Sequence, residues 1–259
     1  MRFAALVSLA GTVGATTVPL AHYSAEATND AGKTIAFHID PMVDTTTVKA
    51  DEAGHGFSFP GGVAWTDEHV DATSEGDAVL GMGPGSAFMA EHQVVTFNPT
   101  KGKMVVGEYD ASPDCKEGHM IFAEQTSSTW RIPLAFNGDP MASTSGDFQI
   151  GFYQDVFITP EGFSRQFFKF YERQISNYQD EGKEYTHENA VADSPVIHIS
   201  MDGGFNMDLA PADYVVDNDD TTFGWSPSRN DIVLPTSILN RLVVQLDAAH
   251  HRVGVCTAN

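Results

Sequence analysis

Two polar clusters contain residue types that could bind a metal ion. The acidic run at 217–220 (Asp-Asn-Asp-Asp) has the beginnings of a calcium loop, but Thr222 stands where such loops need glycine, and no glutamate closes the loop. His250 and His251 lack the further ligands that a zinc site requires. We therefore expect a solvated acidic loop, histidines in a surface turn, and neither a metal nor a cofactor.

The usual short enzyme motifs are absent from the sequence. It contains no Gly-x-Ser-x-Gly nucleophile elbow, P-loop, His-Glu-x-x-His helix or Cys-x-x-Cys pair. The 14 Lys and Arg residues against 35 Asp and Glu give a formal charge of −21 at pH 7, which repels nucleic-acid phosphates and anionic membranes. We therefore expect no nucleic-acid partner and no membrane partner.

The sequence contains two cysteines, Cys115 and Cys256. In an oxidising compartment an even number favours one disulfide, and closing so long a loop would destabilise the unfolded chain by about 4–5 kcal/mol. Two buried free thiols are the alternative. The sequence thus predicts a Cys115–Cys256 disulfide.

The first residues have the pattern of a secretory signal. Arg2 precedes an apolar run at 3–10, and small residues at 13–15 offer a cleavage site after Ala15. A buried N-terminal strand is the alternative. We expect a signal peptide at 1–15, and hence secretion or delivery to the lumen of an endomembrane or lysosome-like compartment.

Short alternating or apolar segments between Gly, Pro, Asn and Asp clusters predict a mostly β protein. One helix is predicted after Thr159, which could cap it, with Pro160 in the first turn and phenylalanines at 163, 167 and 170 on its buried face. The polar stretch 177–193 has no apolar period and predicts a surface loop. The predicted strands are 33–39, 93–97, 103–106, 196–201, 242–246 and 252–256.

Several segments, in the right order, resemble pepsin-family aspartic proteases. Residues 77–83 (Asp-Ala-Val-Leu-Gly-Met-Gly) resemble the family's Asp-Gly-Ile-Leu-Gly-Leu-Gly element, and 129–132 (Thr-Trp-Arg-Ile) resemble its Tyr-Trp-Gln-Ile strand. Further matches lie at 102–110, 194–204, 211–215, 233–239 and 243–255. The resemblance implies a mostly β, bilobal acid-protease fold with a six-stranded inter-lobe sheet, an N-terminal lobe at 16–127 and a C-terminal lobe at 128–259.

Active members of this family need one Asp-Thr/Ser-Gly triplet from each lobe. Two carboxylates about 3 Å apart share a proton and activate a water molecule. In the first lobe the catalytic position is either Asp44, in Asp-Thr-Thr, or Asp40, in Asp-Pro-Met. Literal similarity favours Asp44, whereas the spacing to Val48 favours Asp40. In both triplets the glycine is replaced, so both readings predict a damaged site.

The second triplet should lie between the strand that follows Trp130 and the predicted helix. Aligned without gaps from Ile150, the family's aspartate becomes Phe152. Asp155 is the only acid near that point, and it could replace the lost group only if the loop shifted by three residues. The second site therefore looks lost, with Asp155 as its remaining candidate.

The family's substrate-covering flap is shortened as well. Only residues 45–76 separate Asp44 from the element at 77–83, and no tyrosine lies between Tyr23 and Tyr109. These losses favour a non-catalytic protein that binds a protein, peptide or glycan in the inter-lobe cleft as an inhibitor or decoy. We also expect this protein to be a monomer. An active acid endopeptidase, using an unusual pair such as Asp44 and Asp155, is the alternative.

Overall fold

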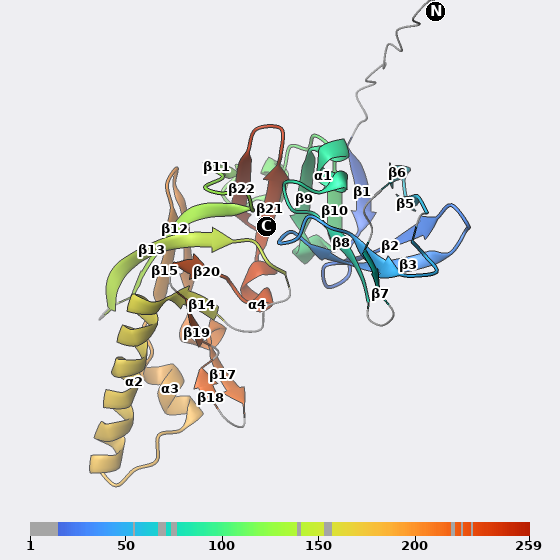
Figure 1. Cartoon of the computed structure of the whole chain (residues 1–259). Coiled ribbons are helices and arrows are strands. Elements are labelled where there is room, and N and C mark those ends of the chain that lie inside the picture. Colours follow the sequence, from blue (N-terminus) through green and yellow to red (C-terminus); the bar gives the residue numbers. More distant parts are fainter. Residues whose placement is uncertain are drawn as a thin grey trace, which may run out of the picture.

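The computed structural model describes residues 15–53, 55–66, 71–73, 77–138, 141–152, 157–218, 221–223, 225–228 and 230–259. These residues form a mostly β molecule with two lobes and a sheet between them (Figure 1). This is the architecture that the sequence predicts. The proposed signal peptide lies outside the described residues except for Ala15.

The sheet between the lobes has six antiparallel strands in the order β1-β10-β9-β21-β22-β11. Four of them were predicted, and β9 and β21 are buried along their whole length. Apolar residues dominate both, so either face can pack against a lobe. The bounds are β1 Thr16–Pro19, β9 Val94–Asn98, β10 Lys103–Val106, β11 Ile121–Glu124, β21 Leu242–Asp247 and β22 Arg252–Thr257.

The N-terminal lobe contains a seven-stranded sheet in the order β6-β5-β2-β3-β8-β4-β7, on the right in Figure 1. Its core is aromatic: the ring centroids of Phe37 and Trp65 lie 5.6 Å apart, and those of Phe57 and Trp65 lie 5.4 Å apart. Helix α1 (Ala87–His92) follows this sheet. The strands are β2 Ser24–Asn29, β3 Thr34–Asp40, β4 Thr47–Lys49, β5 Phe57–Phe59, β6 Val63–Trp65, β7 Asp71–Thr73 and β8 Ala78–Gly81.

The C-terminal lobe contains a five-stranded sheet in the order β16-β15-β12-β13-β20, with two small two-stranded sheets, β14–β19 and β17–β18. Short helix α4 (Thr236–Leu239) leads from this lobe to β21. The strands are β12 Arg131–Gly138, β13 Met141–Gln149, β14 Phe157–Pro160, β15 Ile197–Met201, β16 Phe205–Leu209, β17 Val215–Asn218, β18 Thr221–Phe223, β19 Trp225–Ser228 and β20 Asp231–Ile232.

Helix α2 (Glu161–Asp180) is the predicted helix, with a different beginning. Pro160 is its N-cap residue, and no side chain caps it. The expected cap, Thr159, instead belongs to β14, which pairs with β19, and its hydroxyl hydrogen-bonds that of Ser164. Phe163 and Phe167 are fully buried, as predicted.

The prediction of a surface loop at 177–193 was wrong. Helix α2 continues to Asp180, and a second helix, α3 (His187–Asp193), follows. A capping box starts α3, because the Thr186 hydroxyl accepts from the Asn189 backbone N–H while the Asn189 side chain accepts from the Thr186 backbone N–H. Ala190 is its buried residue. Local capping thus makes a helix where the apolar period is missing.

The predicted disulfide is confirmed. Cys115 and Cys256 are bonded, with their Cα atoms 5.6 Å apart and a sequence separation of 141. Cys256 lies in β22, so the bond ties the segment after β10 to the central sheet. Among the described residues, the helices are too short or too polar to cross a membrane.

Candidate functional site

Asp40 is the last residue of β3, in the middle of the N-terminal sheet. Strand β3 runs parallel to β8, and Asp40 lies opposite Gly81. Strand β4 pairs with the other side of β8 through Thr47 and Val79. The chain that follows Asp40 therefore crosses over the end of β8 to reach β4, and we call this arrangement the first crossing.

The glycines of the 77–83 element are explained by this crossing. A Cβ atom on Gly81 would lie 2.6 Å from the backbone oxygen of Thr45. A Cβ atom on Gly83 would lie 2.9 Å from the backbone oxygen of Val43. Real Cβ atoms do not approach backbone atoms this closely, so a side chain at either position would push the crossing chain away.

Asp40 is half-buried and holds the turn that follows it. Its Oδ1 accepts the backbone N–H of Met42 at 2.8 Å. Burial raises the pKa of this carboxyl group, and the hydrogen bond from Met42 only partly offsets the effect. Asp40 therefore keeps its proton to a higher pH than an ordinary aspartic acid.

Asp44, the other first-lobe candidate, is exposed and lies within the crossing. Its Oδ1 accepts the backbone N–H of Gly85 at 3.0 Å, so the carboxylate fastens the turn after β8. It also faces a hollow of about 480 Å³ at the segment that joins the lobes. The other residues around this hollow are Pro84, Gly85, Gln125, Ser127, Ser128 and His251.

The C-terminal lobe contains a second parallel strand pair, β13 with β20, and Ile158 forms a bridge with Val233 just after β20; we call the ends of these strands the second crossing. Strand β13 runs parallel to β20, with Asp147 opposite Asp231 and Phe148 opposite Ile232. Three residues further along this register, Gly151 falls opposite Pro235, as Asp40 falls opposite Gly81. Sequence alignment put Phe152 at the equivalent of the catalytic position. The strand register instead selects its neighbour, Gly151.

Met42 of the first crossing lies against Gly151 of the second. A Cβ atom on Gly151 would be 2.6 Å from the sulfur of Met42. The two crossings therefore meet through a thioether and a residue without a side chain. A side chain at 151 would need Met42 to move first.

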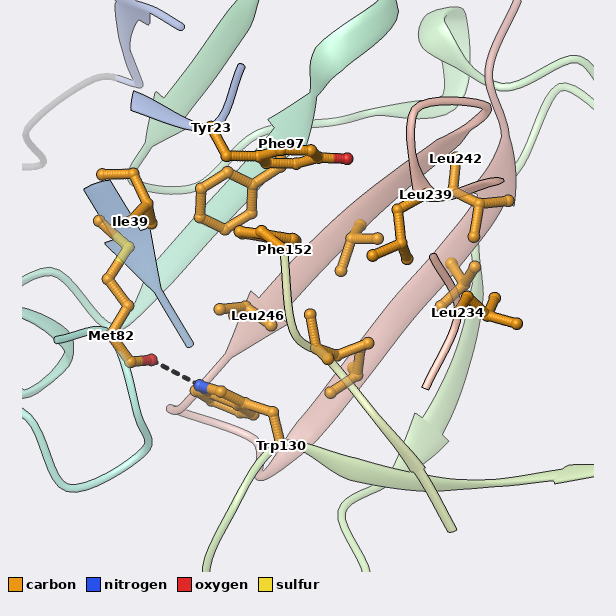
Figure 2. Close-up of a cluster of buried hydrophobic side chains, with 14 of the residues drawn as sticks. Tyr23, Ile39, Met82, Phe97, Trp130, Phe152, Leu234, Leu239, Leu242 and Leu246 are labelled. Carbon is orange, nitrogen blue, oxygen red and sulfur yellow. Dashed lines mark hydrogen bonds between the residues drawn. The ribbon is translucent and has the colours of Figure 1, made fainter. Parts of the chain in front are cut away.

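Phe152 packs into the base between the lobes. Its ring stacks on that of Tyr23, with centroids 4.1 Å apart, and meets Phe97 edge-on at 4.8 Å (Figure 2). Tyr23 comes from the N-terminal lobe and Phe97 from the central sheet. Beside this cluster, the Trp130 indole N–H donates to the backbone oxygen of Met82 at 2.6 Å, as Figure 2 shows. Aromatic packing thus joins the three parts of the molecule.

Asp155, the second-lobe candidate, lies outside the described residues. The nearest described segments, 148–152 and 157–160, contain no acidic residue. Asp147 is the next acid back along β13, and its Oδ1 accepts a hydrogen bond from the Thr126 hydroxyl at 3.3 Å. The strand registers make Asp40 and Gly151 equivalent, and of these two residues Asp40 alone is acidic.

The segment between Asp44 and the 77–83 element, where the family has its flap, contains a short hairpin made by β5 and β6. A Cβ atom on Gly61, in its turn, would lie 2.6 Å from the Thr16 side chain. The tip of the hairpin thus rests on β1 of the central sheet. The described residues also contain no group of three or more His, Cys, Asp or Glu side chains arranged to hold a metal ion.

The contact of Met42 with Gly151 escaped the sequence analysis. A signal for it exists: the 233–235 segment (Val-Leu-Pro) repeats the 79–81 segment (Val-Leu-Gly), and counting back from each through its parallel partner strand gives Gly151 and Asp40. Apolar patterning alone could not supply that count.

Comparison of the sequence with protein-family models and with curated proteins gives no match. Comparison of the structure does. The aspartic proteinase from Irpex lacteus superposes with a TM-score of 0.69 at 13% sequence identity, over 95% of this chain and 98% of the proteinase. At this identity the likeness concerns the fold. The chain therefore has the bilobal, mostly β fold of the pepsin-like aspartic proteinases.

Proposed function

We propose that this protein is a secreted or lumenal, non-catalytic relative of the pepsin-like proteases that binds a protein or peptide between its lobes, as an inhibitor or decoy. The observation that carries this proposal is the register of the two parallel strand pairs. When the register of β13 and β20 is extended by three residues, Gly151 takes the position that Asp40 has in the first lobe. Acid proteolysis needs two carboxyl groups that share a proton. Here one partner has no side chain.

The first crossing supports the same conclusion. Met42 occupies the position two residues after Asp40, where the family has glycine, and its side chain reaches Gly151. The thioether supplies neither a proton nor a charge at that point. Asp40 with its raised pKa would then act alone, and groups that work as one catalytic unit lose most of their effect when one is removed.

The proposed extracellular or lumenal location rests on the disulfide and on the N-terminal signal pattern. The proposed lobe boundaries, 16–127 and 128–259, fit strands β2–β8 on one side and β12–β20 on the other. Strands from both segments contribute to the central sheet, so the two lobes would not separate freely.

The test is an assay of denatured-protein cleavage between pH 2 and 6, with and without pepstatin. We expect no pepstatin-sensitive turnover from the wild-type protein. Gly151→Asp should be equally inactive, because the new side chain meets the Met42 sulfur. The double variant Met42→Gly/Gly151→Asp removes that obstacle and is the proper attempt at restoring a dyad. Pepstatin-sensitive turnover by the wild type that Asp40→Asn abolishes would establish the endopeptidase alternative.

Binding needs its own measurement. Peptides selected from a random library on the wild-type protein should slow hydrogen exchange of the backbone amides at 40–43 and 150–152. Protection confined to segments far from both crossings would contradict a binding site between the lobes. The two assays are independent, since the first tests loss of chemistry and the second tests gain of a ligand.

A further inference from the structure

A cavity of about 630 Å³ lies apart from the two crossings, where β1, the β5–β6 turn, the end of α1 and strands β9 and β10 meet. Cavities of about 300–1,000 Å³ are typical of small-molecule sites. Asp40, Met42 and Gly151 are not among its lining residues. Whatever it binds is therefore independent of the function proposed above.

The cavity has an apolar part and an open turn. Val63, Val94 and Val106 line it, and each is at most 5% exposed. Gly61 and Gly62, with φ of +89° and +87°, form the turn beside them. A Cβ atom on Gly62 would touch nothing within 4 Å. The valines thus form an apolar floor against which the end of a hydrocarbon body could rest, beside a turn that carries no side chain.

The charged groups lining the cavity are acidic. Glu91, from α1, and Glu108, just after β10, are both exposed, and neither forms an ion pair with a described Lys, Arg or His side chain. His92 also lines the cavity, and its Nε2–H donates to the backbone oxygen of Ala64 at 3.0 Å. Burial lowers the pKa of His92, so the imidazole is neutral at pH 7 and does not cancel the glutamates.

We propose that this cavity binds a small organic cation, in which an ammonium or guanidinium group is carried on an apolar body. The body would pack on Val63, Val94 and Val106, and the charge would face Glu91 and Glu108. Unpaired carboxylates beside buried apolar surface complement such a ligand in both charge and hydropathy. A free amine and a lysine side chain share this chemistry, and we expect the free amine to be sufficient.

The first test is calorimetric titration of the full chain with benzylamine at pH 7.5, and with benzyl alcohol as its uncharged counterpart. Benzylamine should bind saturably with one ligand per chain. Benzyl alcohol should bind about tenfold more weakly or worse, because it lacks the charge-assisted contact. Equal binding of the two probes, or no binding of benzylamine, would overturn the proposal.

Paired charge variants separate this site from general attraction to a chain of charge −21. Glu91→Gln/Glu108→Gln should weaken benzylamine about tenfold or more. Glu117→Gln/Glu184→Gln, which removes the same charge from exposed positions elsewhere, should leave the affinity unchanged. If both pairs weaken binding equally, attraction is diffuse and the site is wrong.

A steric variant tests the cavity without altering its charge. Ala64 is exposed on β6 and lines the cavity. Ala64→Phe should fill the space and abolish benzylamine binding while both glutamates remain. Retained affinity in a variant with an unchanged unfolding midpoint would place the ligand elsewhere. If the variant fails to fold, the charge pairs still decide the question.

Discussion

The two crossings have the same strand arrangement but are held together differently. In the first, the backbone of β8 lies directly against the backbone of Thr45, and no room is left there for a side chain on Gly81. In the second, Gly151 faces the flexible side chain of Met42, and Phe152 beside it is locked between Tyr23 and Phe97. The geometry of the first crossing thus depends on glycine, while that of the second depends on aromatic packing.

This difference bears on the loss of catalysis proposed above. An aspartate is not needed to close the second crossing, since buried aromatic rings supply packing free energy there. The acid can then be lost without loss of the fold. In the first crossing, the Asp40 side chain accepts the Met42 N–H, a contact that an asparagine side chain could also make.

The largest effect on stability should come from removing the Phe152 ring, which packs between Tyr23 and Phe97. Phe152→Ala should lower the free energy of unfolding by about 3–5 kcal/mol, since the ring is fully buried and its cavity cannot collapse between three parts of the molecule. Phe168→Ala, on the 37% exposed Phe168 of α2, should change it by about 0.5 kcal/mol or less. Urea unfolding measures both. Equal losses of unfolding free energy in the two variants would mean that Phe152 does not hold the parts of the molecule together.

The main pH dependence should come from Asp114, in the segment between β10 and β11. The Asp114 side chain is 4% exposed and lies 2.8 Å from the Nζ atoms of both Lys101 and Lys103. Burial alone would raise its pKa, but hydrogen bonds from these lysines, Asn98 and Tyr109 outweigh burial and hold the pKa well below its usual range. Asp114→Asn should therefore cost about 3 kcal/mol at pH 7.

That contribution is present above the unfolded-state pKa, near 3.8, and is lost as the pH falls toward the lower folded-state pKa. Thermal unfolding of the wild type and Asp114→Asn should thus converge below about pH 4. The exposed Asp202 provides the control, and Asp202→Asn should follow the wild type at every pH. A constant gap between Asp114→Asn and the wild type would contradict the assignment.

Adding one methyl group to each crossing compares them directly. Gly81→Ala should destabilise by about 1–3 kcal/mol, because the Thr45 backbone cannot move aside. Gly151→Ala should cost less than about 1 kcal/mol, because the Met42 side chain can rotate. Gly162→Ala, in α2 with open space around its Cβ position, should stabilise by about 0.5–1 kcal/mol. Similar costs at Gly81 and Gly151 would erase the distinction between the crossings.

The smallest effect should come from Asp40 and should have the opposite pH sign to that of Asp114. Because the pKa of Asp40 is raised in the folded state, its ionisation opposes folding as the pH rises through that pKa. Asp40→Asn keeps an acceptor for Met42 and should stabilise by less than about 1 kcal/mol at pH 7, with no gain at low pH. Differential scanning calorimetry across pH 3–7 checks this. A loss at pH 7 would show that the ionised carboxylate supports the turn.

The extent of sequence prediction differed between these same regions. Strands β9, β10, β21 and β22 could be predicted because their apolar runs end at clear turn residues. The glycines at 81 and 83 were recognised as part of a family element, and the structure supplies the reason for them, which is the close approach of the chain at 43–45. The disulfide could be predicted from the presence of two cysteines and from the expectation of an oxidising compartment.

Other features depend on distant parts of the chain. Threonine is a favoured N-cap residue, but the pairing of β14 with β19 places Thr159 in a sheet instead. Phe152 and Gly151 are adjacent, and alignment by apolar pattern differs by one residue from the extended register of β13 and β20. Only the pairing with the two-residue strand β20 sets that register. Helix α3 depends on Thr186 and Asn189, whose capping role is invisible to hydrophobic periodicity.

The position of β21 and β22 has a consequence for the order of folding. These strands follow all others along the chain, yet they fill the middle of the central sheet, between β9 and β11. During synthesis, β9 and β11 are made before β21 and β22, so their backbone groups that face these strands have no partner at first. Contacts between such distant segments also slow folding. The partner of Cys115 is made 141 residues later. Until then the Cys115 thiol, one edge of β9 and the strand β11 lack the partners that they have in the finished sheet, so early folding should depend on chaperones and on disulfide exchange.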